Sequence, residues 1–239
     1  MFGFDPLFIM IFIGTLAVSG TASMMVKRRF KAAQQVSLSS GMMGHQVAAL
    51  MMREAGLTEV KIEEHQGFLS DHYNPLSKTL ALSHDVYWGK NAAAVGVAAH
   101  EAGHALQHAE NYFPMWVRSA LVPAANIGSG LGPWLVIIGG FLGIASAWGH
   151  MLAVLGVFLF AAATFFTVIT VPVEFDASSR AKHQLLRLRV TEHGVEQEAV
   201  SSVLTAAGLT YVAAAATSIA WLFYYALRSG LLGGGRSND

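Results

Sequence analysis

The chain has 239 residues, 54% hydrophobic and 13% charged, whereas roughly a quarter of an ordinary soluble domain is charged, so the composition favours a membrane protein. The formal net charge of zero excludes the basic field of a nucleic-acid-binding protein and a strongly acidic disordered tail. Cysteine is absent, which excludes disulfides, thiolate metal sites and a cysteine nucleophile and leaves His, Glu and Asp as the strong metal ligands.

The first apolar segment covers residues 7–26. It carries no charge over about 20 positions, enough for a helix to cross a hydrocarbon core of ~30 Å. The basic sequence KRRFK follows this segment, whereas a cleaved signal peptide carries its basic residues before the apolar run. We therefore expect an uncleaved anchor that begins outside the cytoplasm and ends inside it.

Residues 37–118 are mixed in character. SSGMMGHQVAALMMREAG predicts a helix with a serine cap and an end at Gly56. TEVKIEEH and SKTLALS predict two strands, with the turn DHYNPL before the second, and a further helix carries HEAGH. At roughly 80 residues this α+β unit is thin for an isolated domain, so we expect it to lean on the membrane helices.

Three more apolar segments follow. Spans at 119–147 and 151–172, separated by WGH, predict a helical hairpin, and a last span is expected at 205–227 after the polar segment 173–204. The end of the chain, RSGLLGGGRSND, is expected to be flexible. The expected fold is a mainly α membrane protein with about four transmembrane helices and a small α+β unit, forming a single membrane-embedded domain over 1–239.

The basic residues predict the orientation in the membrane. Of 15 Lys and Arg, nine lie in 27–118 and four in 173–204, whereas two lie elsewhere, at Arg228 and Arg236. Loops rich in Lys and Arg stay on the cytoplasmic side. Both polar segments are therefore expected in the cytoplasm.

HEAGH carries the residue types of a metal site. His100 and His104 are four residues apart, so on an α-helix both imidazoles project from one face and can bind one ion. In proteins with this pattern the glutamate, here Glu101, takes a proton from water and delivers it to the leaving amine. The alternative is accidental placement in an Ala-, Val- and Gly-rich helix. His108 lies about 12 Å along the axis from His100, too far to share its zinc.

The third ligand is expected at Glu174, in the other polar segment. VPVEFDASSRAKHQLL enters that segment from the third span, with Pro172 near a helix start and Glu174 in the first turn. Two His and one Glu form a catalytic arrangement that keeps a fourth position open for water. Asp176 is the rival, roughly 200° around a helix from Glu174. The alternative for Glu174 is a preference for the positive end of a helix.

Four sequences, LSDHYNPLSKTLALS, VAAHEAGHALQHA, PVEFDASSRA and AAGLTYVAAA, together resemble the YugP-type neutral zinc metallopeptidases, multi-pass membrane proteins of bacteria. The resemblance covers nearly the whole chain and implies a gluzincin-like peptidase with a zincin-like catalytic unit. It implies one Zn²⁺ per chain, held by His100, His104 and Glu174, with Glu101 as the catalytic acid/base. With the loop charges, it implies a polypeptide substrate and a site on the cytoplasmic face of the bacterial inner membrane.

EFDAS is also similar to the EYEAD type of segment in the HtpX-like membrane proteases, where the first Glu binds zinc and the final Asp orients a ligating histidine. Ser178 stands at the place of that Asp, and a serine can accept a hydrogen bond from an imidazole but carries no charge. Asp176 and Asp71 are the alternatives for orienting a ligand.

Other residues are candidates for contacts with the substrate. His72 and Tyr73 could donate to the oxyanion or could only cap a turn, and Arg180 and Tyr211 are further candidates. The strand SKTLALS could pair with an extended peptide along a free edge or could be an ordinary structural strand.

The function expected is that of a zinc-dependent membrane endopeptidase. One alternative is intramembrane cleavage of the site-2 type, but the apolar stretch between Asn91 and Glu110 is shorter than the ~20 residues of a span, and the Asp-Gly partner motif of those enzymes is missing. The other alternative is a non-enzymatic scaffold stabilised by zinc. Glu101 argues against it, because a structural zinc site closes its fourth position with a protein ligand.

Overall fold

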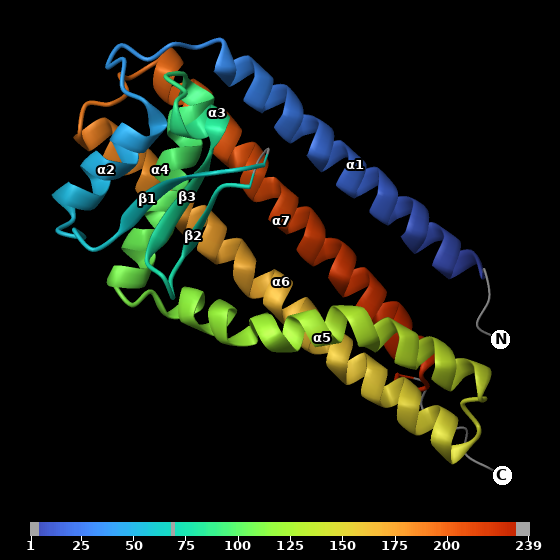
Figure 1. Cartoon of the computed structure of the whole chain (residues 1–239). Coiled ribbons are helices and arrows are strands. Elements are labelled where there is room, and N and C mark those ends of the chain that lie inside the picture. Colours follow the sequence, from blue (N-terminus) through green and yellow to red (C-terminus); the bar gives the residue numbers. More distant parts are fainter. Residues whose placement is uncertain (1–4, 68–69, 233–239) are drawn as a thin grey trace. The chain divides into compact units, whose positions relative to one another are not determined.

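The computed structural model describes residues 5–67 and 70–232. Its long helices are α1 (Pro6–Gln34), α5 (Phe113–Phe141), α6 (Ala147–Arg187) and α7 (Val195–Arg228), and all four are long and apolar enough to cross a membrane (Figure 1). The predicted fold class, a mainly α membrane protein with four spans and a small α+β part, is confirmed. Most of the tail expected to be flexible, residues 233–239, lies outside the described residues.

Two predicted helix boundaries are wrong. The second and third spans are separated at 142–146, where Gly143 has a φ of 84°, and WGH belongs to α6. Pro172 does not start a helix but lies inside α6. Proline removes one backbone hydrogen bond from a helix, a loss that membrane helices tolerate. Because Glu174 is therefore not at a helix start, a preference for the positive end of a helix does not account for it.

Contacts within the chain form two compact units. The first comprises Met1–Thr21, Val117–Val171 and Tyr211–Asp239, and the second comprises Ala22–Trp116 and Pro172–Thr210. In the first unit, small residues let α5 and α6 approach closely: Gly128 faces the Leu159 carbonyl, and Gly156 faces that of Gly132. The second unit contains the α+β part and the residues of the candidate site.

The sheet of the second unit has three strands, β1 (Lys61–His65), β2 (His72–Asn74) and β3 (Thr79–Ser83), in the order β1-β3-β2. β1 runs parallel and β2 antiparallel to β3. Both predicted strands are present, but β2 lies within the segment expected to be only a turn. β1 pairs with β3 over all five of its residues, whereas β2 pairs only with residues 79–81. Most of SKTLALS therefore has no free edge for a peptide, which favours the alternative of a structural strand.

The helix α2 (Gly44–Glu54) ends as predicted but begins differently. It is followed by Gly56, whose φ of 71° ends the helix in the left-handed conformation. The residue that precedes the first turn of α2 is Met43, and its N–H donates to Gln46 Oε1 at 2.9 Å. The predicted serine cap is therefore wrong. Gly44 packs against the Val86 carbonyl in the short helix α3 (His84–Tyr87), where a side chain would not fit.

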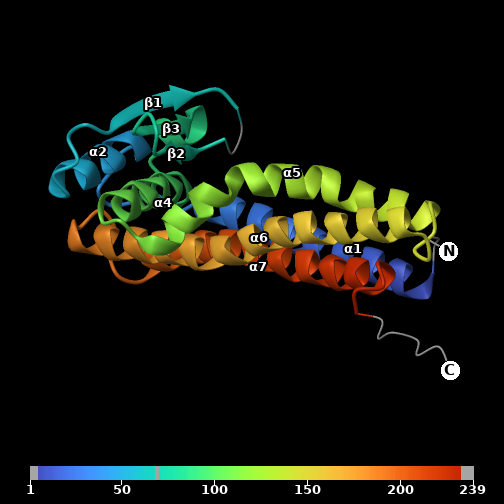
Figure 2. The same ribbon diagram turned by 90° about the horizontal axis from the view of Figure 1, so that it is seen from below.

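The helix α4 (Ala92–Ala109) carries HEAGH and lies inside the second unit. Asn91 caps it, its Oδ1 accepting from the N–H of Ala94 at 3.0 Å. Small residues such as Ala98 and Ala102 are fully buried in a core shared with Leu80 and Leu82 of β3. Figure 2 shows α4 between the sheet and the C-terminal part of α6. Glu101, His104 and Gln107 of α4 are accordingly buried.

Candidate metal centre

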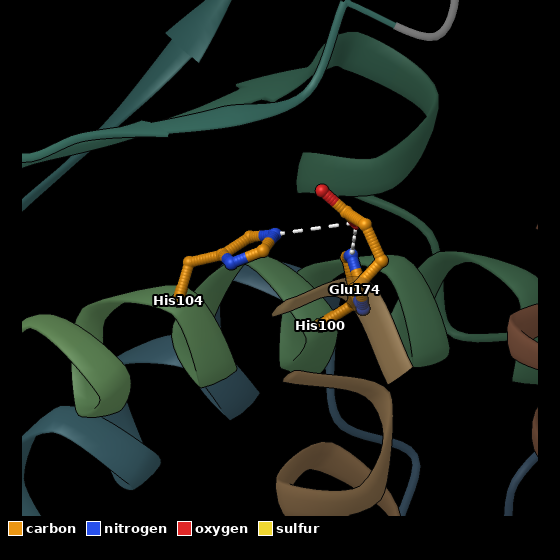
Figure 3. Close-up of side chains that lie close together, drawn as sticks. All are labelled: His100, His104 and Glu174. Atoms are coloured by element: carbon orange, nitrogen blue, oxygen red, sulfur yellow. Dashed lines mark hydrogen bonds and ion pairs between the residues drawn. The ribbon is translucent and has the colours of Figure 1, made fainter. Parts of the chain in front are cut away.

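His100 and His104 project from the same face of α4, one turn apart. Their ring centroids are 4.8 Å apart and the rings lie edge to face. Both side chains are largely buried, with exposed fractions of 14% and 9%. The spacing in the sequence therefore produces the neighbouring imidazoles that it predicts (Figure 3).

Glu174 of α6 completes a cluster with the two imidazoles. Its side chain is 2% exposed, and Oε2 lies 3.1 Å from His100 Nε2 and 3.5 Å from His104 Nε2 (Figure 3). The ligand atoms of the three residues all lie within 4.8 Å of one another. Two ligand atoms bound tetrahedrally at ~2.1 Å from a zinc ion lie about 3.4 Å apart, so the arrangement fits Zn²⁺.

A close crossing of α4 and α6 brings these residues together. Gly103 faces the backbone of Ala177, and a Cβ at this position would lie 2.6 Å from the Ala177 carbonyl oxygen. Only glycine permits this approach. Gly103 lies next to His104, and Ala177 lies almost one turn beyond Glu174, so the contact sets the distance between the imidazoles and the carboxylate.

The outward-facing nitrogens of the two imidazoles have different partners. His100 Nδ1 lies 3.1 Å from the hydroxyl oxygen of Ser178, which stands where the HtpX-like segments have the orienting Asp. His104 Nδ1 lies 2.9 Å from Gln107 Oε1. Both Nε2 atoms are therefore left to face Glu174 and a metal ion.

The charge around His104 favours its protonated form when no metal is bound. Burial alone would lower the pKa of His104, but its hydrogen bond to the Glu174 carboxylate and the negative charges of Glu101 and Glu174 raise the pKa above its ordinary value. Glu101 is itself 9% exposed. This excess of negative charge at the imidazoles is what a divalent cation would neutralise.

Asp71, an alternative for orienting a ligand, contacts a different group. Its carboxylate accepts from the backbone N–H of Ser83 at 2.7 Å and from the Ser83 hydroxyl at 3.1 Å. Burial raises the pKa of Asp71, opposed by these two hydrogen bonds, and the nearby charge of Glu101 raises it further. Asp71 therefore holds the end of β3 beside Glu101.

The remaining candidates lie outside the three-residue cluster. The hydroxyl of Tyr73 lies 2.9 Å from His108 Nδ1, and His72 is exposed, with Nδ1 2.8 Å from the carbonyl oxygen of Ser70. Asp176, the rival third ligand, accepts hydrogen bonds from Arg180 and from Gln107. Arg180 also pairs with Glu110, and Tyr211 belongs to the other unit.

Gln107 was not predicted from the sequence. It is fully buried and lies one turn after His104 on the same helix. A polar residue three positions after a histidine, in a helix otherwise rich in alanine, was the signal that could have indicated it.

Comparison with known proteins agrees with this geometry. Residues 8–230 match the family described as "Putative neutral zinc metallopeptidase". The chain is 42% identical over 213 residues to a protein of Bacillus subtilis (strain 168) named "Putative membrane protease YugP", and the match covers 89% of this chain and 92% of that protein. No solved structure matches the chain.

Proposed function

This chain belongs to the neutral zinc metallopeptidase family, and on that premise we propose that it is a membrane-embedded endopeptidase that hydrolyses peptide bonds with one zinc ion held by His100, His104 and Glu174. The observation that carries the proposal is the position of Glu174 Oε2, 3.1 and 3.5 Å from two imidazole nitrogens of another helix. Two histidines and one glutamate leave a fourth coordination position open for water or substrate, as in catalytic zinc sites.

Each residue has a distinct role in this proposal. When bound, zinc supplies a Lewis acid that polarises the scissile carbonyl and makes water more acidic. Glu101, next to His100 on α4, accepts the proton of the attacking water on its carboxylate and then donates it to the leaving amine. Ser178 and Gln107 hold the outer nitrogens of the imidazoles at 3.1 and 2.9 Å, which orients both rings.

The substrate would be an extended polypeptide. β3 is the central strand, but β2 is at an edge of the sheet, and both β2 and β3 contact α4. An extended peptide added to the edge of β2 would pair through its backbone groups beside the helix that carries Glu101. Backbone pairing of this kind gives little selectivity for side chains, which suits an endopeptidase.

The proposed location is the bacterial inner membrane, with the candidate site facing the cytoplasm. The distribution of Lys and Arg supports this orientation. Since the chain has no cysteine, single introduced cysteines can test it. In whole cells, an impermeant thiol reagent should label Ala145→Cys, between the second and third spans, and should label His193→Cys, between α6 and α7, only after the membrane is opened. The reverse pattern would refute the orientation.

The decisive experiment for the function is Glu101→Gln in the purified full chain. The variant should keep its zinc, because none of the three ligands is changed, and should lose hydrolysis of an unfolded polypeptide by roughly 100-fold or more, as expected when a general base is removed. Glu63→Gln, the same change at an exposed position of β1, is the matched control and should keep full activity.

Two outcomes would contradict the proposal. Hydrolysis by Glu101→Gln at the rate of the unchanged chain would remove the proposed role of Glu101. Zinc bound by the unchanged chain without cleavage of any unfolded polypeptide or membrane-protein substrate would favour a zinc-stabilised scaffold instead.

A further inference from the structure

We propose that Gln107 is a positioning residue that fixes the proton of His104 on Nδ1, so that Nε2 presents its lone pair to the metal, and that Asp176 and Arg180 hold the amide in the required orientation. The inference rests on the zinc site of the proposed function. It adds a residue that neither the HEAGH spacing nor the third ligand identifies.

The amide of Gln107 is completely buried, so its polar atoms need partners. Burying an amide without hydrogen bonds costs about 1–3 kcal/mol in proteins. A glutamine side chain offers two N–H donors and one carbonyl acceptor. Gln107 uses all three: Nε2 donates to the Val173 carbonyl oxygen at 2.8 Å and to Asp176 Oδ2 at 2.8 Å, and Oε1 faces His104 Nδ1 at 2.9 Å.

The two partners of Nε2 determine which way the amide points. A backbone carbonyl oxygen can only accept hydrogen bonds. Asp176 Oδ2 also accepts a hydrogen bond from Arg180 Nε, at 2.5 Å, so it too acts as an acceptor. Rotating the amide by 180° would place Oε1 against two acceptors and lose both hydrogen bonds. The nitrogen of Gln107 must therefore face α6, and the oxygen must face His104.

This orientation determines the proton position on His104. An amide oxygen accepts but does not donate, so a hydrogen bond to it requires a hydrogen on Nδ1. A neutral imidazole with its hydrogen on Nδ1 carries its lone pair on Nε2. That nitrogen is the one that faces Glu174 Oε2 at 3.5 Å, on the side of the proposed metal. The amide thus selects the tautomer that can bind zinc.

The same contacts connect the two helices that supply the ligands. His104 and Gln107 of α4 and Glu110, the residue that caps the end of this helix, follow one another at intervals of three residues, and Arg180 of α6 pairs with Glu110. Gln107 also donates a hydrogen bond to the carbonyl oxygen of Val173, which lies in α6 directly before Glu174. One amide therefore orients a histidine and holds the backbone next to the third ligand. His100 differs, because the Ser178 hydroxyl beside it can donate or accept and does not select a tautomer.

The test measures the affinity of the purified full chain for zinc alone, by competition with a chelator. Gln107→Met keeps the length of the side chain but removes all three hydrogen bonds, and we expect a loss of about 10- to 100-fold in zinc affinity, the usual effect of losing such an outer contact. The matched control is Gln197→Met. Gln197 bridges Thr191 and the Lys182 carbonyl away from the histidines, and its variant should bind zinc as the unchanged chain does.

A double variant separates hydrogen bonding from packing. In Gln107→Glu, a carboxylate can still accept from His104 but faces the carboxylate of Asp176, so zinc affinity should fall. Adding Asp176→Asn supplies an N–H donor to that carboxylate and should restore part of the lost affinity, while the hydrogen bond to the Val173 carbonyl stays lost. A role in packing alone predicts no such rescue.

Three results would overturn the inference. They are zinc affinity of Gln107→Met equal to that of the unchanged chain, an equal loss in Gln197→Met, or no rescue in a folded double variant. All are distinct from failure of the proposed function, because zinc binding is measured without hydrolysis. If the unchanged chain binds no zinc, the proposed function itself is refuted.

Discussion

Gly103→Ala tests whether the crossing of α4 and α6 sets the geometry of the candidate metal centre. The added methyl group would lie 2.6 Å from the carbonyl oxygen of Ala177 and 3.3 Å from its Cα. Both neighbouring atoms belong to the backbone of a helix, so no side-chain rotation can relieve the contact. The helices themselves must move apart.

The size of this movement can be worked out from the structure. To bring the 2.6 Å distance to 3.0–3.4 Å, α4 and α6 must separate by about 0.4–0.8 Å. Zinc ligand distances tolerate only about ±0.2 Å. We therefore expect zinc affinity to fall about 10- to 100-fold, or ~1.4–2.8 kcal/mol. Overpacking should cost a further ~1–3 kcal/mol of folding stability, offset by ~1 kcal/mol from replacing a helical glycine.

The assay is zinc competition with a chelator, together with thermal unfolding of the same preparations. Gly96→Ala is the control, because it makes the same change on the same helix. Its Cβ would lie 3.3 Å from Cγ1 of the Val200 side chain, which can adjust, so affinity and stability should be unchanged or slightly raised. Equal zinc affinity in Gly103→Ala and Gly96→Ala would refute the reasoning.

Three other measurements follow from the site. Chelation of zinc should abolish hydrolysis and lower the unfolding temperature. Zinc added at 100 times its Kd should restore activity and ~2.7 kcal/mol of folding stability. Full activity after chelation would contradict a metal-dependent reaction. Tyr73→Phe should reduce kcat less than tenfold, because the Tyr73 hydroxyl is hydrogen-bonded to His108. Loss of a hydrogen-bond donor to the oxyanion would instead reduce kcat about 100- to 1000-fold. In zinc-free protein, Glu174 and Glu101 raise the pKa of His104. The resulting stabilisation should be complete below the ordinary histidine pKa of about 6.5 and disappear as the pH rises through the raised pKa. The same unfolding profile in His104→Gln would contradict this.

The sequence predicts the four spans well because a span depends mainly on composition. About 20 uncharged residues are enough to identify one. Their ends are harder to predict, since they depend on local conformation. WGH resembles a break but lies in α6, and Pro172 resembles a helix start but lies inside the same helix.

The candidate site shows the same division between local and distant signals. The spacing of His100 and His104 is a property of one helix, so their neighbouring imidazoles follow from the sequence alone. The approach of Glu174 could be expected only from the topology of the spans. Gln107 lies three residues from His104, but its two other partners, which fix the amide, lie 66 and 69 residues away in the sequence and could not be foreseen. β2 was missed because its three residues are extended through pairing with β3.

The distance along the chain between the residues of the metal cluster affects when the site can be completed during synthesis. Glu174 follows His100 by 74 residues. Most of the chain between them belongs to α5 and to the part of α6 that precedes Glu174. At about 5–20 residues per second, a ribosome adds Glu174 roughly 4–15 s after His100. During that interval the nascent chain has the two imidazoles but not the carboxylate of Glu174. A peptidase assembled in this order would remain inactive until its third span has been made, which would protect the nascent chain and its insertion machinery from premature cleavage.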